Sequence, residues 1–134
     1  MKNINCYNSS IEDVKRNLSS GISKVIGYEK GSGKVEFVCK NGSIVIFYHE
    51  QDCCESVWLE DSDGLINKTD IFTDCNWCEV EEVVAYGNPL DKDDESCTWT
   101  FYKFKTNKGY DTLRWYGTSN GYYSEGVDFE IWEN

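Results

Sequence analysis

Residues 98–125 read TWTFYKFKTNKGYDTLRWYGTSNGYYSE, and this stretch decides the fold. It holds two runs rich in aromatic and β-branched residues, separated by the turn sequence Asn107-Lys108-Gly109. Such runs are typical of β-strands, because flat rings and branched side chains pack well on a pleated surface. We therefore expect strands over about 97–106 and 110–116, joined as an antiparallel hairpin.

Shorter strands and turns continue this pattern through the rest of the chain. Asn41-Gly42 is the strongest hairpin signal and separates two strand-like runs. The second run, 44–48, is apolar on both faces, which predicts a central strand. A capped, amphipathic pattern over 9–18 predicts a short helix. Further strands are expected over 22–29, 34–40, 55–60, 79–86 and 126–132.

These elements predict an α+β fold, with a mostly antiparallel sheet of about six to seven strands and one or two short helices. Residues 65–78 fit either a short helix or a covering loop. No linker or change of composition divides the chain, so we expect a single domain over 1–134. A chain of this length can bury roughly 68% of its unfolded surface.

The charge of the chain is strongly negative and unevenly distributed. The formal net charge is −11, and the acids are concentrated after residue 48. Residues 50–95 carry fifteen acids and two bases. A negative surface repels the phosphate backbone, which argues against direct binding of DNA or RNA. An acidic surface can keep a protein soluble, or it can mimic nucleic acid and so bind a basic partner protein.

The chain shows no signal for export or membrane insertion. Its first ten residues contain no apolar run, and no stretch approaches the roughly 20 apolar residues that span a bilayer. We expect a cytoplasmic protein without membrane contact. In such a compartment the seven cysteines should remain reduced thiols.

Cysteines and the single histidine form the one candidate metal set. His49 precedes Cys53 and Cys54, and Cys75 and Cys78 form a C-x-x-C pair. Zinc favours these side chains, but strong zinc motifs repeat the C-x-x-C or pair it with a spaced second half. Redox catalysis by Cys75 and Cys78 would need a βαβ context, which the sequence does not show. A cysteine protease would draw its catalytic residues from separate secondary-structure elements, whereas His49 and Cys53 lie in one segment. We therefore predict no metal, no cofactor and no catalytic residue.

Arg114 lies among tyrosines and tryptophans, followed by a turn rich in hydroxyl groups. A half-buried arginine needs an anionic partner. That partner is either an internal acid such as Glu125 or Asp128, or the phosphate or carboxylate of a ligand. The second alternative predicts a site for a flat anionic molecule, with aromatic stacking and hydroxyl donors. Its ligand-binding candidates are His49, Arg114, Tyr116, Ser119, Asn120, Tyr122 and Tyr123.

Three segments carry a resemblance to a known family. They are HEQDCCESV at 49–57, ESCTWTFYK at 95–103 and KGYDTLRWYGTSNGYYSEGVDF at 108–129. Together they resemble a family of small phage and prophage proteins of unknown function. The first 30 residues and the segment 61–94 do not obviously belong to it. The resemblance implies viral origin and a place in the cytoplasm of a bacterial host, but no established activity.

Small phage accessory proteins are frequently counter-defence factors, so the resemblance leaves two function classes. The first, which we favour narrowly, is immune evasion by a sponge that binds and sequesters a nucleotide-type immune signal. The second is an anti-CRISPR-like acidic inhibitor that blocks a nucleic-acid-handling defence enzyme of the host. An enzyme that degrades the signal ranks third, because the sequence shows neither a metal site nor a general base at a suitable spacing. Trp132 on a charged strand face is consistent with a homo-oligomer.

Overall fold

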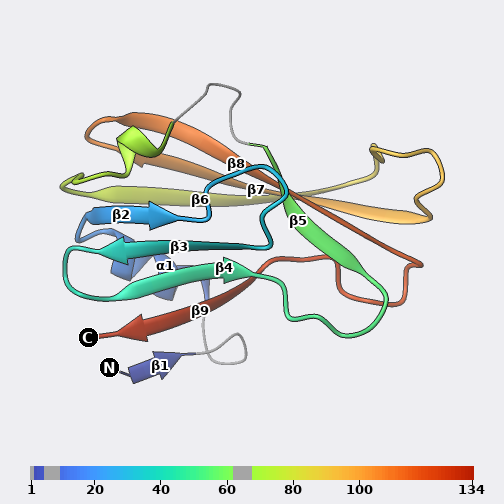
Figure 1. Ribbon diagram of the computed structural model, residues 1–134, viewed down its shortest axis with the longest axis horizontal. Coiled ribbons are helices and arrows are strands. Elements are labelled where there is room, and N and C mark those ends of the chain that lie inside the picture. Colours follow the sequence, from blue (N-terminus) through green and yellow to red (C-terminus); the bar gives the residue numbers. More distant parts are fainter. Residues whose placement is uncertain (1, 5–9, 62–67) are drawn as a thin grey trace.

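The computed structural model describes residues 2–4, 10–61 and 68–134. Helix α1 spans Ile11–Leu18, and a 3-10 helix, η1, spans Lys68–Ile71. The strands are β1 Lys2–Ile4, β2 Ile22–Ile26, β3 Lys34–Cys39, β4 Ile44–Tyr48, β5 Ser56–Asp61, β6 Cys78–Tyr86, β7 Ser96–Thr106, β8 Gly109–Ser119 and β9 Asp128–Glu133. They form a five-stranded sheet of order β1-β9-β4-β3-β2 and a four-stranded sheet of order β5-β8-β7-β6 (Figure 1).

The mostly antiparallel architecture is confirmed, because every pairing between these strands is antiparallel. The prediction of six to seven strands was too low, since the described residues form nine strands in two sheets with one α-helix. The extra strands include β1, which is too short to give a clear sequence pattern. Of the ambiguous segment 65–78, residues 65–67 lie outside the described residues and 68–71 form η1.

The hairpin of β7 and β8 is the longest pairing in the described structure. It runs from Ser96 opposite Ser119 to Thr106 opposite Gly109. Its inner face packs on the five-stranded sheet through Phe104, whose ring centroid lies 5.2 to 5.9 Å from those of Phe37 and Phe47. Aromatic pairs at such distances add about 0.5–1.5 kcal/mol each beyond the area they bury. The core therefore lies between the two sheets.

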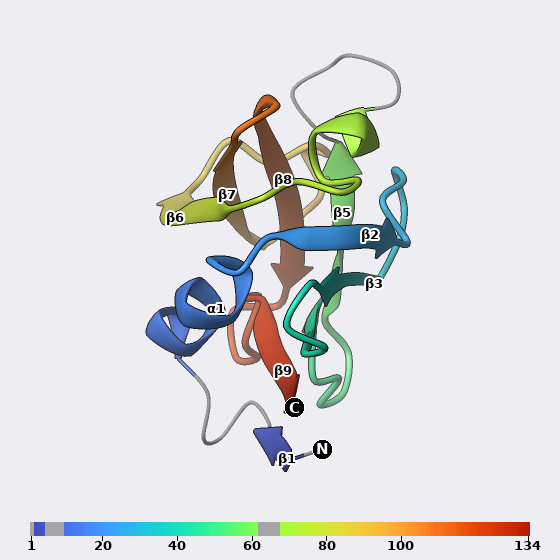
Figure 2. The same cartoon turned by 90° about the vertical axis from the view of Figure 1, so that its left-hand side faces the viewer.

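Helix α1 closes one open side of the two sheets. It packs against β4 and β9 of one sheet and β6 of the other, as Figure 2 shows. Ser10 caps it, because its hydroxyl accepts from the backbone N–H of Asp13 and the Asp13 carboxylate accepts from the backbone N–H of Ser10. Arg16 pairs with Glu133 and so ties the helix to β9. The predicted helix over 9–18 is confirmed in its described part.

The expectation of seven free thiols is wrong for one pair. Cys53 and Cys54 are adjacent in sequence and are joined by a disulfide. The other four described cysteines are free and buried: Cys39, Cys75, Cys78 and Cys97. Burial is the main cause that raises the pKa of the Cys39 thiol to about 12, and the nearby Cys75 raises it further. Such thiols are poor nucleophiles at neutral pH.

Gly117 in β8 allows the segment before β9 to fold back onto the four-stranded sheet. A Cβ atom at this position would lie 2.2 Å from the backbone oxygen of Glu125. Real Cβ atoms do not approach backbone this closely, so a side chain here would displace the segment around Glu125.

We predict that Gly117→Ala lowers the free energy of unfolding by about 1–3 kcal/mol, the usual cost of overpacking. Gly33→Ala is the matched control, because a Cβ atom there meets nothing within 4 Å. Urea denaturation of both variants measures the difference. Equal stability of the two variants would contradict the close approach at Gly117.

Candidate functional site

Three loops gather at one end of the molecule, on the right in Figure 1. They are 49–55, 87–95 and 120–127, and we call them together the acidic end. With Asp128, which starts the following strand, they carry nine acids and one lysine. Hydrogen bonds connect the first and third of them: His49 bonds the backbone oxygen of Gly126, and the backbone N–H of Glu50 donates to Asp128.

His49 and Glu55 form the buried centre of the acidic end. The two side chains are 3% and 0% exposed, and His49 Nε2 lies 2.9 Å from Glu55 Oε2. The other ring nitrogen, Nδ1, lies 2.8 Å from the carbonyl oxygen of Gly126. Both ring nitrogens of His49 therefore have a partner, one on each of two loops. The His49–Glu55 pair and the contact with Gly126 together fix these two loops.

The loop after His49 wraps around the Glu55 carboxylate. Backbone N–H groups of Asp52 and Cys53 donate to it at 3.1 and 2.8 Å, and Gln51 donates at 3.0 Å. Burial alone would raise the pKa of Glu55, but the bonds from Cys53, His49 and Asp52 outweigh it and lower the pKa to about 2. Glu55 is therefore a structural carboxylate, ionised at neutral pH.

Glu125 is a second buried carboxylate, 8% exposed. Its two oxygens accept from the hydroxyl groups of Thr98, at 2.7 Å, and Ser119. These donors lie on β7 and β8, so Glu125 fixes loop 120–127 to the inner face of the four-stranded sheet. In the described part of the chain, no cation lies within ion-pair distance of Glu125.

Loop 87–95 covers the outer face of the same sheet. The Tyr116 hydroxyl donates to Asp94 and accepts from the backbone N–H of Leu90 at 3.1 Å. Trp99 donates its indole N–H to the carbonyl oxygen of Asn88 at 3.0 Å. Burial and the bond to Asp94 both raise the pKa of Tyr116. Tyr116 is therefore a fully buried anchor for this loop.

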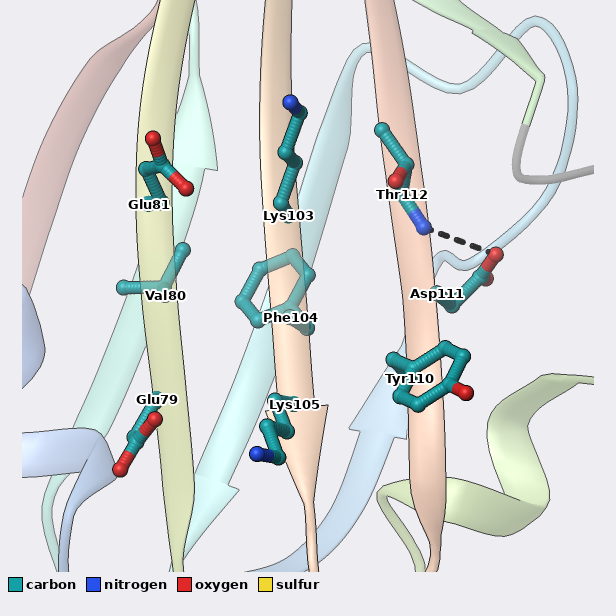
Figure 3. A pocket seen from close by; sticks show the side chains of 9 residues that line it. All are labelled: Glu79, Val80, Glu81, Lys103, Phe104, Lys105, Tyr110, Asp111 and Thr112. Carbon is teal, nitrogen blue, oxygen red and sulfur yellow. Dashed lines mark hydrogen bonds between the residues drawn. The ribbon is translucent and has the colours of Figure 1, made fainter.

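Two surface depressions bear on ligand binding. One, of about 250 Å³, lies in the acidic end and is lined partly by Asp93, Asp94 and Glu95. The other, of about 400 Å³, lies on the outer face of the four-stranded sheet. Figure 3 shows acids of β6 in it, lysines of β7 beside them, and Tyr110 and Thr112 of β8 on the far side. The first is too acidic to favour a phosphate.

The structure distributes the seven predicted ligand-binding residues over several places. His49 and Ser119 meet the same segment, through Gly126 and Glu125, and use their polar atoms there. Ser119 and the exposed Asn120 line the acid-lined depression. Tyr116 is buried under loop 87–95, whereas Tyr122 is 88% exposed. Tyr123 is half-buried, and Arg114 is half-buried on the outer face of the sheet. Whether these residues bind a ligand stays a prediction.

Arg114 lies in register with Phe101 of β7 and Asp61 of β5. The suggested pairing of this arginine with Glu125 or Asp128 is wrong. Glu125 accepts from the two hydroxyl groups described above, and Asp128 accepts from the backbone N–H of Glu50 at 2.8 Å. The inner and outer faces of the sheet separate Arg114 from Glu125, which explains the difference.

A sequence model of one protein family matches residues 6–129, and its description is a domain of unknown function, DUF7448. The chain belongs to the DUF7448 family. The match includes residues 6–30 and 61–94, so the expectation that these segments do not belong to the family is corrected. No curated protein and no solved structure matches the chain. The phage origin of this DUF7448 protein therefore stays a prediction.

Two further searches of the described residues bear on function. No group of three or more His, Cys, Asp or Glu side chains among them could hold a metal ion. No described helix is long and apolar enough to cross a membrane. Sequence reasoning missed Glu55 and Glu125 as central residues. The run HEQDCCE placed Glu55 near His49, but nothing local in the sequence indicates that Glu125 meets Thr98.

We predict that Glu55 makes the protein sensitive to acid. Because its pKa is lowered from the ordinary 4.5 to about 2, its contribution to stability is complete above pH 4.5 and is lost as the pH falls to about 2. Glu55→Gln should unfold at lower urea concentration at pH 7 and lose less stability on acidification. Urea midpoints at pH 7 and pH 3 measure this.

The control is Glu29→Gln, which removes the same charge from an exposed position. An acid dependence in Glu55→Gln as steep as in the wild type and the control would show that Glu55 does not carry the effect.

Proposed function

We propose that this protein acts as a binding protein that docks its acidic end onto a basic surface of a partner protein. In the phage setting that the sequence resemblance implies, the partner is a nucleic-acid-handling defence enzyme of the bacterial host. Such enzymes bind phosphate backbones with lysine and arginine, so a surface of carboxylates can compete with their substrate.

The observation that carries this proposal is the concentration of charge in three loops at one end of the molecule. Exposed apolar and aromatic side chains lie in the same part of the chain, with Tyr86 78% and Leu90 51% exposed at the start of loop 87–95. Interfaces often place aromatic anchors inside a polar rim. Charge on such a rim steers association and sets its salt dependence.

The internal bonds of the acidic end support docking over enclosure of a small molecule. His49, Tyr116 and Ser119 already use their polar atoms to fix loops. A ligand that took over these groups would have to break bonds between buried partners, which costs about 1–3 kcal/mol for each group left unsatisfied. A preformed, rigid surface loses little freedom when it binds a protein.

We predict that the triple variant Asp91→Asn, Asp93→Asn, Glu95→Gln weakens binding to a captured defence nuclease at least about tenfold, or 1.4 kcal/mol. All three side chains are exposed, so the fold should persist. Surface plasmon resonance with purified nucleases should show a lower association rate, and duplex DNA should compete with the wild type.

The control variant Glu12→Gln, Glu29→Gln, Asp70→Asn removes three charges from exposed positions away from the acidic end. Equal weakening by both variants would show that net charge alone acts. Unchanged affinity in the first variant would refute docking through the acidic end.

The depression on the outer face supports a second candidate, the sequestration of a nucleotide-type signal. Lys103 and Lys105 form no ion pair with any residue in the described part of the chain, although acids of β6 face them in register. Tyr110, 71% exposed, lies beside them and offers a face for stacking. The two lysines could hold phosphates, and Arg114 of β8 lies on the same outer face of the sheet.

We predict under this candidate that the protein takes up a cyclic dinucleotide or an ADP-ribose-type nucleotide and releases it intact on heating. Lys103→Ala with Lys105→Ala should weaken uptake at least about tenfold. Lys2→Ala with Lys24→Ala is the control of equal charge. Absence of uptake by the wild type would refute sequestration, and release of an altered nucleotide would indicate an enzyme.

A further inference from the structure

A groove of about 330 Å³ lies on the inner face of the four-stranded sheet, beside the acidic end. Its floor is formed by Thr98 and Thr100 of β7, and one wall by residues of β6. The opposite wall is the segment 124–127, which Glu125 holds in place. This volume lies at the small end of the range for binding pockets and suits one long side chain.

One group in the groove lacks the counter-charge that its burial calls for. Glu125 is 8% exposed and accepts only from two neutral hydroxyl groups, with no cation near it in the described part of the chain. Thr100, which is 3% exposed, also lines the groove. Buried carboxylates are almost always paired with a cation.

The wall formed by β6 adds a second means of recognition. β6 is an edge strand of the four-stranded sheet, and α1 packs near its first residues. Its second half is open: Glu82, Val84 and Tyr86 are exposed and line the groove. An open edge can accept an extended peptide as a further strand, while alternate side chains of that peptide enter a neighbouring pocket.

We propose that the groove binds a lysine or arginine side chain from an extended basic segment of a partner protein. The cation bonds to the Glu125 carboxylate, and its stem lies against Val84 and Tyr86. An arginine can also donate to the Thr100 hydroxyl, and the ring of Tyr86 offers a cation–π contact. The peptide backbone lies along the open half of β6.

This inference deepens the proposed function, because it gives the basic partner a defined point of entry. Charge complementarity selects this occupant over the others. Glu82 and Glu125 make the groove anionic, so it repels a nucleotide, whereas a basic side chain replaces the missing counter-charge. Carboxylates along β6 would also repel a second copy of the same edge.

The test uses an acetylated, amidated eight-residue peptide of alternating threonine and valine with one central arginine. The matched control peptide carries citrulline, which keeps the shape of arginine but has no charge. Calorimetry should show binding of the arginine peptide at least tenfold tighter than that of the citrulline peptide. NMR of labelled protein should place the shifts on β6 and on 124–127.

Glu125→Gln should abolish the preference for arginine, while Glu29→Gln should keep it. Thr100→Val is the second variant and should weaken arginine binding without unfolding the chain, so the inference stays testable if Glu125→Gln fails to fold. Equal binding of the two peptides, or shifts outside the groove, would overturn the inference.

The same variants separate this inference from the proposed function. If neutralising the acids of loop 87–95 weakens capture of the nuclease but Glu125→Gln and Thr100→Val do not, the acidic end docks without the groove and the inference fails. If the arginine peptide binds in the groove but no nuclease is captured, the proposed function fails and the groove remains.

Discussion

The burial of Glu125 against the long hairpin is the contact on which the functional end of this protein depends. Its carboxylate accepts from one hydroxyl group on β7 and one on β8. The next residue, Gly126, offers its carbonyl oxygen to His49. These contacts hold loop 120–127 between the two sheets. Without them loop 120–127 would lose its fixed position, and with it one wall of the groove.

The acidic end shows two carboxylates in contrasting surroundings. Glu55 accepts from two backbone N–H groups and contacts His49, so its carboxylate is satisfied by partners inside the molecule. Glu125 receives neutral hydroxyl groups alone among the described residues. Both carboxylates are buried, but their partners differ, and this distinguishes a structural acid from one that suits an external cation. This contrast favours Glu125 as the point of contact with a basic partner.

Local signals in the sequence predicted local structure well. The Asn41-Gly42 turn, the hairpin around residue 108 and the capped helix near residue 10 all form, because turn and cap chemistry acts within a few residues. The division into two sheets was missed, since it depends on β5 pairing with β8, more than 50 residues later. Residue types alone do not specify such a distant pairing.

The candidate site was predictable in its chemistry but not in its geometry. The sequence grouped His49 and Ser119 as candidate ligand-binding residues, and both contact the segment 125–126, although ligand binding by them stays a prediction. It also offered Glu125 as a partner for Arg114, yet strand alternation places the two on opposite faces of the sheet. The decisive contact joins Thr98 to a residue 27 positions later. It forms because Gly117 lets two backbone segments approach, which no sequence pattern shows.

The most direct measurement of the central claim is chemical-shift mapping of the labelled protein during titration with its captured protein partner. The account predicts that the largest shifts fall on residues 82–95 and 120–127. Shifts concentrated instead on the outer face, around 103–112, with the acidic end unchanged, would contradict it.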